Sequence, residues 1–145
     1  MRLPASVLDG VAVLVLNAPE LATLTGSGAA GDPADLASLA GKLERDIVVT
    51  LGENGALVVQ AAERSAVHIP PPPAPIRDTT GAGDCFCGAL AVLLAEGADL
   101  TEASRLAVAA GTLSTTAAGA RGKLPTRDEV TALAAGLAPR LIATP

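Results

Sequence analysis

An aspartate at the start of an apolar stretch is the residue of this sequence best placed to do chemistry. Asp84 directly follows Gly81, Ala82 and Gly83, within the segment IRDTTGAGDCFCGAL at 76–90. Glycines leave no side chain in the way of an incoming group, and the first-turn N–H groups of a helix have no helical carbonyl to bond. Such a turn can hold a phosphate or a developing oxyanion. A carboxylate beside it could accept a proton from an attacking hydroxyl, as phosphoryl transfer requires.

The same residues allow plainer interpretations. An acidic residue in the first turn of a helix contributes about 0.3–1 kcal/mol through the helix dipole, with no catalytic role. Cys85 and Cys87 are the only cysteines, and their spacing gives neither a disulfide framework nor a zinc site. They are most simply small apolar residues of a helix. Cys85, close to the helix N-terminus, is also a candidate for a lowered pKa and redox sensitivity.

The glycine turn must be held by a helix, and the residues after it have the pattern of one. Four apolar residues repeat at the spacing of a single helical face: Phe86, Leu90, Leu93 and Leu94. They predict an amphipathic helix over 82–96. Further helices are predicted at 101–117 and 127–137. The last of these begins at Thr126, which has capping-box spacing to Glu129.

Apolar runs elsewhere predict buried strands, at 11–16, 46–52, 55–60 and 66–69. A short helix after the first run ends at Gly26, and a loop extends to residue 31. Asp32 and Pro33 then form a good helix start, and that helix is expected to run to about Leu43. The prolines of 70–75 predict an extended lead-in to the glycine turn. Strands mixed with helices in this order indicate an α/β fold.

Composition excludes several classes of protein. The chain has 145 residues, half of them apolar, with Phe86 as the single aromatic residue, so its core is built from Ala, Val, Leu and Ile. A net charge of −5 argues against a nucleic-acid-binding surface. No apolar run is long enough to span a bilayer, and no signal-peptide pattern occurs at the start. We therefore expect no membrane partner and a cytoplasmic location.

The segment DTTGAGDCFCGAL at 78–90 resembles the second signature of the ribokinase (PfkB) family of carbohydrate kinases. NAPE at 17–20 resembles the family's Asn-x-x-Glu motif, and VVTLGENGALV at 48–58 resembles the strand and turn that line the nucleotide pocket. AAGARGKLP at 117–125 resembles the final loop near the adenine and monovalent-cation sites. The resemblance covers almost the whole chain. It implies a ribokinase-like fold, a Rossmann-like three-layer α/β/α arrangement.

The resemblance also implies a role for each matching residue. Asp84 would be the catalytic base, and Gly81, Ala82 and Gly83 would supply the amides of the anion hole. Asn17 and Glu20 fall on the network that organises Mg²⁺ and phosphates through water. Asp78 and the carbonyl of Thr80 fall on the monovalent-cation site of potassium-dependent members. The residues that would border the nucleotide are Thr50, Gly52, Glu53, Asn54 and Gly55.

The implied reaction is transfer of the ATP γ-phosphate to a hydroxyl of a sugar or sugar-like small molecule. Mg²⁺ would bridge the phosphates, and K⁺ is a candidate second ion. Lys123 falls where a small hydroxyl residue often helps to hold the monovalent cation. Its ammonium could lie near Asp78 and substitute for potassium. The alternative is a solvated lysine on a loop.

The resemblance begins midway through the family's fold, without the N-terminal half that carries a small β-sheet lid and a glycine-rich sugar-binding motif. Residues 1–145 would then form the C-terminal, nucleotide-binding part of the domain, and most residues that select the sugar would be missing. The alternative to a sugar kinase is a nucleotide-binding or structural fragment with no turnover of its own. Because positioning carries much of phosphoryl-transfer catalysis, we expect little turnover from this chain alone. The face that the missing half would cover is expected to be apolar, which favours self-association or a partner chain that supplies this half.

Overall fold

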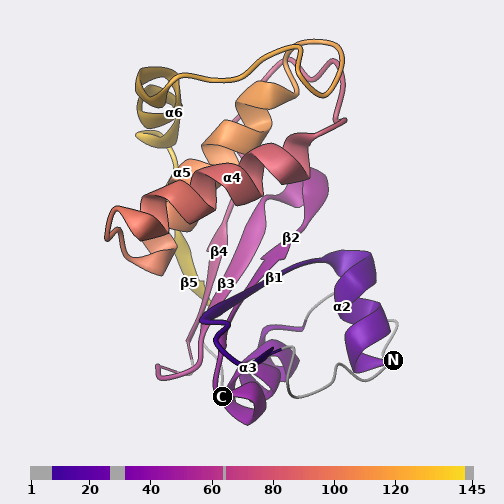
Figure 1. The fold of residues 1–145 in the computed structure, drawn as a ribbon, viewed down its shortest axis with the longest axis vertical. Helices are drawn as coiled ribbons and strands as arrows, with labels where there is room; N and C mark the ends of the chain where they lie inside the picture. Colours follow the sequence, from indigo (N-terminus) through magenta and orange to yellow (C-terminus); the bar gives the residue numbers. More distant parts are fainter. Residues whose placement is uncertain (1–7, 27–31, 64, 143–145) are drawn as a thin grey trace. The chain divides into compact units, whose positions relative to one another are not determined.

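The computed structural model describes residues 8–26, 32–63 and 65–142, and the statements below concern these residues. The first part of the chain contains four of the strands with two helices among them, and helices dominate the second part (Figure 1). The chain divides into two compact units, which are described separately. The sheet unit consists of Met1–Gly52, Ala56–His68 and Arg140–Pro145. The helical unit consists of Glu53–Gly55 and Ile69–Pro139.

A five-stranded mixed sheet, with strand order β1-β2-β3-β4-β5, is the frame of the sheet unit. Its strands are β1 (Val13–Asn17), β2 (Asp46–Thr50), β3 (Ala56–Gln60), β4 (Ser65–Ile69) and β5 (Arg140–Ile142). β1 and β2 run parallel, whereas β2 and β3, and likewise β4 and β5, run antiparallel. The four predicted strands are confirmed. β5 was not predicted.

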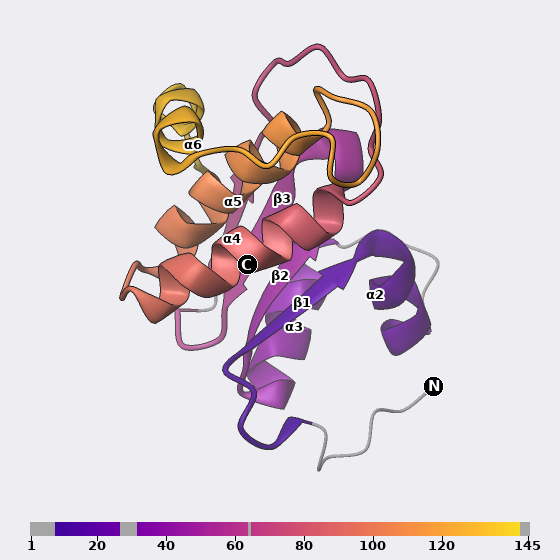
Figure 2. The same ribbon diagram turned by 45° about the horizontal axis from the view of Figure 1, so that its top comes forward.

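Two helices of the sheet unit pack on this sheet. α2 (Ala18–Thr25) contacts β1, and α3 (Pro33–Leu43) lies against β2 and β3 (Figure 2). Leu36 and Ala40 of α3 share a buried cluster with Ile47 and Val49 of β2. Val48, which alternates with them onto the opposite face, is also fully buried. Burial on both faces explains why β2 reads as a continuous apolar run rather than an alternating one.

The predicted start and end of α3 are confirmed. Asp32 is its N-cap, and Oδ1 of Asp32 accepts a hydrogen bond of 2.8 Å from the N–H of Ala34. Pro33 occupies the first turn, where its missing N–H costs nothing. The helix ends at Leu43, because Glu44 adopts a left-handed conformation with φ of 54°. Residues 27–31 of the predicted loop lie outside the described residues.

The helical unit contains α4 (Ala82–Ala95), α5 (Leu100–Ser114) and α6 (Arg127–Ala134). α5 packs against both α4 and α6, and it lies beside α4 in both ribbon views (Figures 1 and 2). Its buried face consists mostly of small residues, including Ala103, Ala107, Ala110 and Gly111. A Cβ on Gly111 would lie 3.2 Å from the carbonyl oxygen of Ala82, so this glycine lets α5 approach the first turn of α4. No described helix has both the length and the apolarity needed to cross a membrane.

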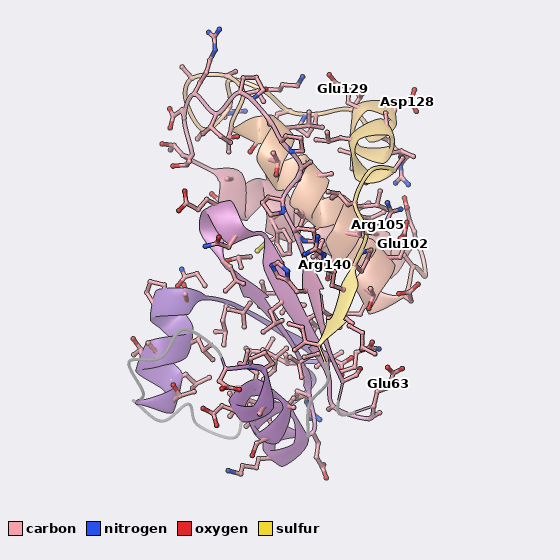
Figure 3. All side chains as sticks on the ribbon, turned by 180° about the vertical axis from the view of Figure 1, so that it is seen from behind. Glu63, Glu102, Arg105, Asp128, Glu129 and Arg140 are labelled. Carbon is pink, nitrogen blue, oxygen red and sulfur yellow. The ribbon has the colours of Figure 1, made fainter. Side chains whose placement is uncertain are left out.

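Two helices end earlier than predicted, at Ser114 instead of 117 and at Ala134 instead of 137. At the first end, the carbonyl of Thr115 accepts hydrogen bonds from the N–H groups of the segment 77–78. At the second, the carbonyl of Ala134 accepts a hydrogen bond from Arg105 of α5. Arg105 also forms an ion pair of 2.7 Å with Glu102 on the same helix (Figure 3). Carbonyls at both ends therefore have hydrogen-bond partners that are distant in sequence.

Candidate functional site

The glycine turn at the start of α4 has the conformation that an anion hole needs. Gly81 is the N-cap, in the left-handed region with φ of 80°, and it provides no side-chain capping bond. The N–H of Ala82 donates to the carbonyl of Thr79 at 3.2 Å. The first helical bond runs from Cys85 N–H to Gly81 O at 2.9 Å. Of the three predicted anion-hole amides, those of Gly81, Ala82 and Gly83, the one of Ala82 is thus used within the turn. The amides of residues 83 and 84 precede the first helical bond, so they carry the positive end of the helix dipole.

Access to these amides is open. Gly83 is exposed, and a Cβ built on it would meet nothing within 4 Å. Asp84 is exposed as well, in the same first turn. An anionic group could therefore approach the backbone beside a carboxylate that is accessible to solvent. An exposed glycine turn and an exposed carboxylate therefore lie next to each other at the start of α4, and their roles as anion hole and proton acceptor stay predictions.

A second loop holds the glycine turn in place through Asp78. One carboxylate oxygen of Asp78, Oδ1, accepts from Thr80 N–H at 2.9 Å, and the other, Oδ2, accepts from Gly119 N–H at 2.7 Å. Hydrogen bonds from Thr80, through its side chain and then its backbone N–H, and from Gly119 lower the pKa of Asp78. We call this set of bonds the Asp78 latch. It joins the segment before the turn to the loop that follows α5.

The two segments also touch at the turn itself. A Cβ on Gly81 would lie 3.1 Å from the Cα, Cβ and carbonyl oxygen of Ala120. The N–H groups of Arg77 and Asp78 both donate to Thr115 O, at 2.8 and 3.1 Å. A larger residue at 81 would push the loop away, and its side chain would also strain the left-handed backbone. Glycine at 81 is thus required by shape and by conformation.

The Asp78 carboxylate and the Thr80 carbonyl are oxygen donors of the kind that hard cations accept. In the part of the chain that the structure describes, no three His, Cys, Asp or Glu side chains gather around a metal-sized space. A cation beside Asp78 would therefore depend largely on backbone carbonyls. The three hydrogen bonds to Asp78 leave part of the acceptor capacity of its carboxylate unused, so the residues fit such an ion.

The hypothesis that Lys123 replaces potassium places its ammonium near Asp78. In the structure, the ion-pair partner of Lys123 is a different carboxylate. Its Nζ donates to Oε1 of Glu129 at 2.8 Å. Glu129 is held at this position by the confirmed capping box of α6, in which its Oε2 accepts from Thr126 N–H. The partner of Lys123 is therefore fixed by the start of the next helix.

Glu129 should make stability depend on pH in the acid range. Its hydrogen bonds with Lys123 and Thr126 lower its pKa from an ordinary 4.5 to about 2. A carboxyl with a lowered pKa stabilises the fold above its ordinary pKa, and this stabilisation is lost as the pH falls through the interval towards 2. We expect Glu129→Gln to flatten the fall in unfolding free energy between pH 5 and pH 2.5, as measured by urea denaturation. Asp128→Asn, on the same helix (Figure 3), serves as the control, and equal slopes for wild type and Glu129→Gln would contradict the prediction.

The predicted redox sensitivity of Cys85 is not supported. Burial raises the pKa of its thiol, against a smaller effect of Ser114. Its Sγ donates to the carbonyl of Ala110 at 3.4 Å. Cys85 is therefore a packing residue at the α4–α5 contact.

In the sheet unit, the predicted magnesium residues Asn17 and Glu20 form a capping box. Oδ1 of Asn17 accepts from Glu20 N–H, and Oε2 of Glu20 accepts from Asn17 N–H, both at 2.8 Å. Their spacing at a helix start was the signal for this box, and the sequence interpretation missed it. Thr50 is the register partner of Asn17 in the parallel pair, so both lie at the carboxyl ends of their strands. In α/β sheets this edge is where ligands bind.

The predicted nucleotide-bordering turn follows β2. Gly52, Glu53 and Asn54 form a short 3₁₀ turn, η1, and all three are exposed. Gly55 is buried, with φ of 84°, and a Cβ there would lie 2.0 Å from the carbonyl oxygen of Ile69. The predicted site residues are thus grouped at an edge of the sheet unit and around the α4 turn of the helical unit.

The chain is similar in sequence to known carbohydrate kinases. A family model described as "pfkB family carbohydrate kinase" matches residues 2–127. The probable fructokinase-4 of Arabidopsis thaliana is 38% identical over 138 residues, which are 90% of this chain and 41% of that protein.

Two solved structures extend the comparison to the fold. The ribokinase of Arabidopsis thaliana, complexed with ribose and ATP, superposes with a TM-score of 0.80 at 32% identity, over 92% of this chain and 44% of that chain. Phosphofructokinase-2 of Escherichia coli, in complex with potassium, superposes with a TM-score of 0.76 at 30% identity, over 90% of this chain and 43% of that chain. The predicted ribokinase-like α/β fold is confirmed, and it is partial, because this chain spans less than half the length of each relative.

Proposed function

The chain belongs to the pfkB family of carbohydrate kinases, and from this premise we propose that its α4 turn binds the phosphates of ATP during transfer of the γ-phosphate to a hydroxyl of a sugar or sugar-like molecule. The observation that carries the proposal is the left-handed Gly81 followed by two open first-turn amides. Phosphate groups are stabilised at such a helix start by the N–H groups and by the dipole. The arrangement is specific to charge rather than to a particular sugar.

In this mechanism, Asp84 accepts the proton of the attacking hydroxyl, while the amides of the turn stabilise the charge that develops on the transferred phosphoryl group. The hydrogen bonds of the Asp78 latch support the turn, so the amides would need little reorganisation during the reaction. Exposure of Asp84 leaves it accessible to an acceptor. Thr50 and η1 would border the nucleotide.

Asn17 and Glu20 would organise Mg²⁺ through water, and Asp78 with the Thr80 carbonyl would hold K⁺. Mg²⁺ held there would supply positive charge to the phosphates of the nucleotide. The capping box uses Oε2 of Glu20 and Oδ1 of Asn17, so Oε1 of Glu20 would be the oxygen left to accept from a water on the ion. The potassium complex of the Escherichia coli relative supports the second assignment.

A second function is a nucleotide-binding fragment without turnover. The observation that favours it is the length of the chain, which covers 41–44% of the three relatives described above. A complete sugar site would then require a further polypeptide segment, from a partner chain or a longer form of the protein. ATP binding without phosphate transfer to any sugar would distinguish this alternative from a sugar kinase.

Calorimetry of Mg·ATP binding tests the phosphate site. Gly83→Asp places a carboxylate in the anion hole, where space is open, so the variant should fold and lose affinity by roughly 10–100-fold through charge repulsion. Gly88→Asp is the matched control, because Gly88 is an exposed α4 glycine whose Cβ would also meet nothing within 4 Å. Equal affinities for the two variants, or a folded wild type that binds no ATP, would reject the phosphate site.

A further inference from the structure

Five basic side chains occur in residues 69–139, all within the described part of the helical unit. Three of them form ion pairs: Arg105 with Glu102 at 2.7 Å, Lys123 with Glu129 at 2.8 Å, and Arg127 with Glu96 at 2.7 Å. The other two are Arg77 and Arg121. Both are exposed, and neither has a carboxylate partner within this described segment.

These two arginines adjoin the same turn although they are far apart in sequence. Arg77 directly precedes Asp78, and its N–H donates to Thr115 O at 2.8 Å. Arg121 directly follows Ala120, which is the residue that limits the space at Gly81. The Asp78 latch joins the two segments. The fold therefore places one unpaired guanidinium-bearing residue on each loop beside the α4 turn.

The negative charges around the turn suggest what Arg77 and Arg121 could contribute to phosphate binding. Asp78 and Asp84 contribute two negative charges next to the proposed phosphate site, and a polyphosphate brought there would be repelled. Arg77 and Arg121 bring two positive charges on the adjoining loops. A guanidinium also presents several N–H donors in a planar array that matches a phosphate group.

We propose that Arg77 and Arg121 bind the phosphate chain of the nucleotide from the two loops that flank the α4 turn. The inference rests on the proposed function and adds two binding residues to it. The first-turn amides hold the phosphates from the helix end, and the arginines supply the cationic groups. Because the contribution depends on ligand charge, it should be larger for ATP than for AMP.

Calorimetry on the full chain tests the proposal with Mg·ATP and with AMP. We expect Arg77→Gln and Arg121→Gln each to weaken Mg·ATP binding by about tenfold, and the double variant by roughly 100-fold. AMP binding should weaken less, and higher salt should narrow the difference between wild type and double variant. Arg127→Gln is the matched control, since Arg127 is exposed but paired with Glu96.

The outcomes separate this inference from its premise. If the wild type binds Mg·ATP and the double variant binds within about twofold of it, the arginine assignment is wrong and the phosphate site stands. The arginine assignment is also wrong if Arg127→Gln weakens Mg·ATP binding as much as the double variant does. It is wrong as well if the double variant weakens the binding of AMP and of ATP by the same factor. If the folded wild type binds no ATP, both proposals fall. Circular dichroism of each variant shows whether a loss of binding reflects unfolding.

Discussion

Replacing Asp84 with asparagine should slow phosphate transfer to a sugar hydroxyl by about 10²–10⁴-fold, with little change in Mg·ATP affinity. The amide is close in shape to the carboxylate but cannot accept the hydroxyl proton. Because Asp84 is exposed in the first turn of α4, the substitution should leave the fold intact. The rate is measured as transfer of labelled γ-phosphate to a panel of sugars, and the affinity by calorimetry.

The control for Asp84→Asn is Asp128→Asn, which also removes a carboxylate from the first turn of a helix. Both variants lose about the same dipole stabilisation, so only the loss of a proton acceptor distinguishes them. Equal transfer rates for the two variants would mean that Asp84 is an ordinary first-turn residue. If the wild type itself transfers no phosphate, the chain is the nucleotide-binding fragment of the second hypothesis.

Gly55→Ala should destabilise the protein by about 2–5 kcal/mol, the largest effect on stability that we expect. Two causes act together: an alanine at φ of 84° is strained, and its Cβ would lie 2.0 Å from the carbonyl oxygen of Ile69. That oxygen belongs to the backbone, so it cannot turn aside as a side chain would. Urea unfolding gives the free-energy change, and a loss below about 1 kcal/mol would contradict the prediction.

Two further glycines separate the causes. Gly52 has φ of 58° but open space around its Cβ, so Gly52→Ala should cost only the backbone term, about 1–2 kcal/mol. Gly88 lies in α4 with neither constraint, and Gly88→Ala should stabilise the helix by roughly 0.5–1 kcal/mol. If Gly55→Ala matched Gly52→Ala, the close contact with Ile69 would have no energetic weight.

The elements that the sequence predicted are those whose cause is local. The helical spacing after Gly83 predicted α4, which begins at Ala82 and ends within one residue of the expected end. Asp32 and the Thr126–Glu129 pair predicted the starts of α3 and α6, because capping depends on residues within one turn. The glycine turn was predicted from Gly81 and Gly83, which directly precede the helical spacing of α4. The catalytic and binding roles of its residues remain predictions.

What the sequence could not predict depends on distant partners. β5 has three residues and no alternation, and it exists as a strand because it pairs with β4. Beyond the end of α5, the carbonyl of Thr115 bonds to the segment 77–78, and at the end of α6 the carbonyl of Ala134 bonds to Arg105. The partner of Lys123 is Glu129, whose position is fixed by the capping box of α6.

The pairing of β4 with β5 has a consequence for synthesis on the ribosome. His68 is the register partner of Arg140, so all of Ile69–Pro139 is made between the two halves of one strand pair. β2 and β3 are joined by a short turn and can pair as soon as they emerge. At a synthesis rate of about 5–20 residues per second, the edge of β4 that pairs with β5 stays unpaired for on the order of ten seconds. An unpaired strand edge is a template for aggregation, so nascent chains are most vulnerable during that interval.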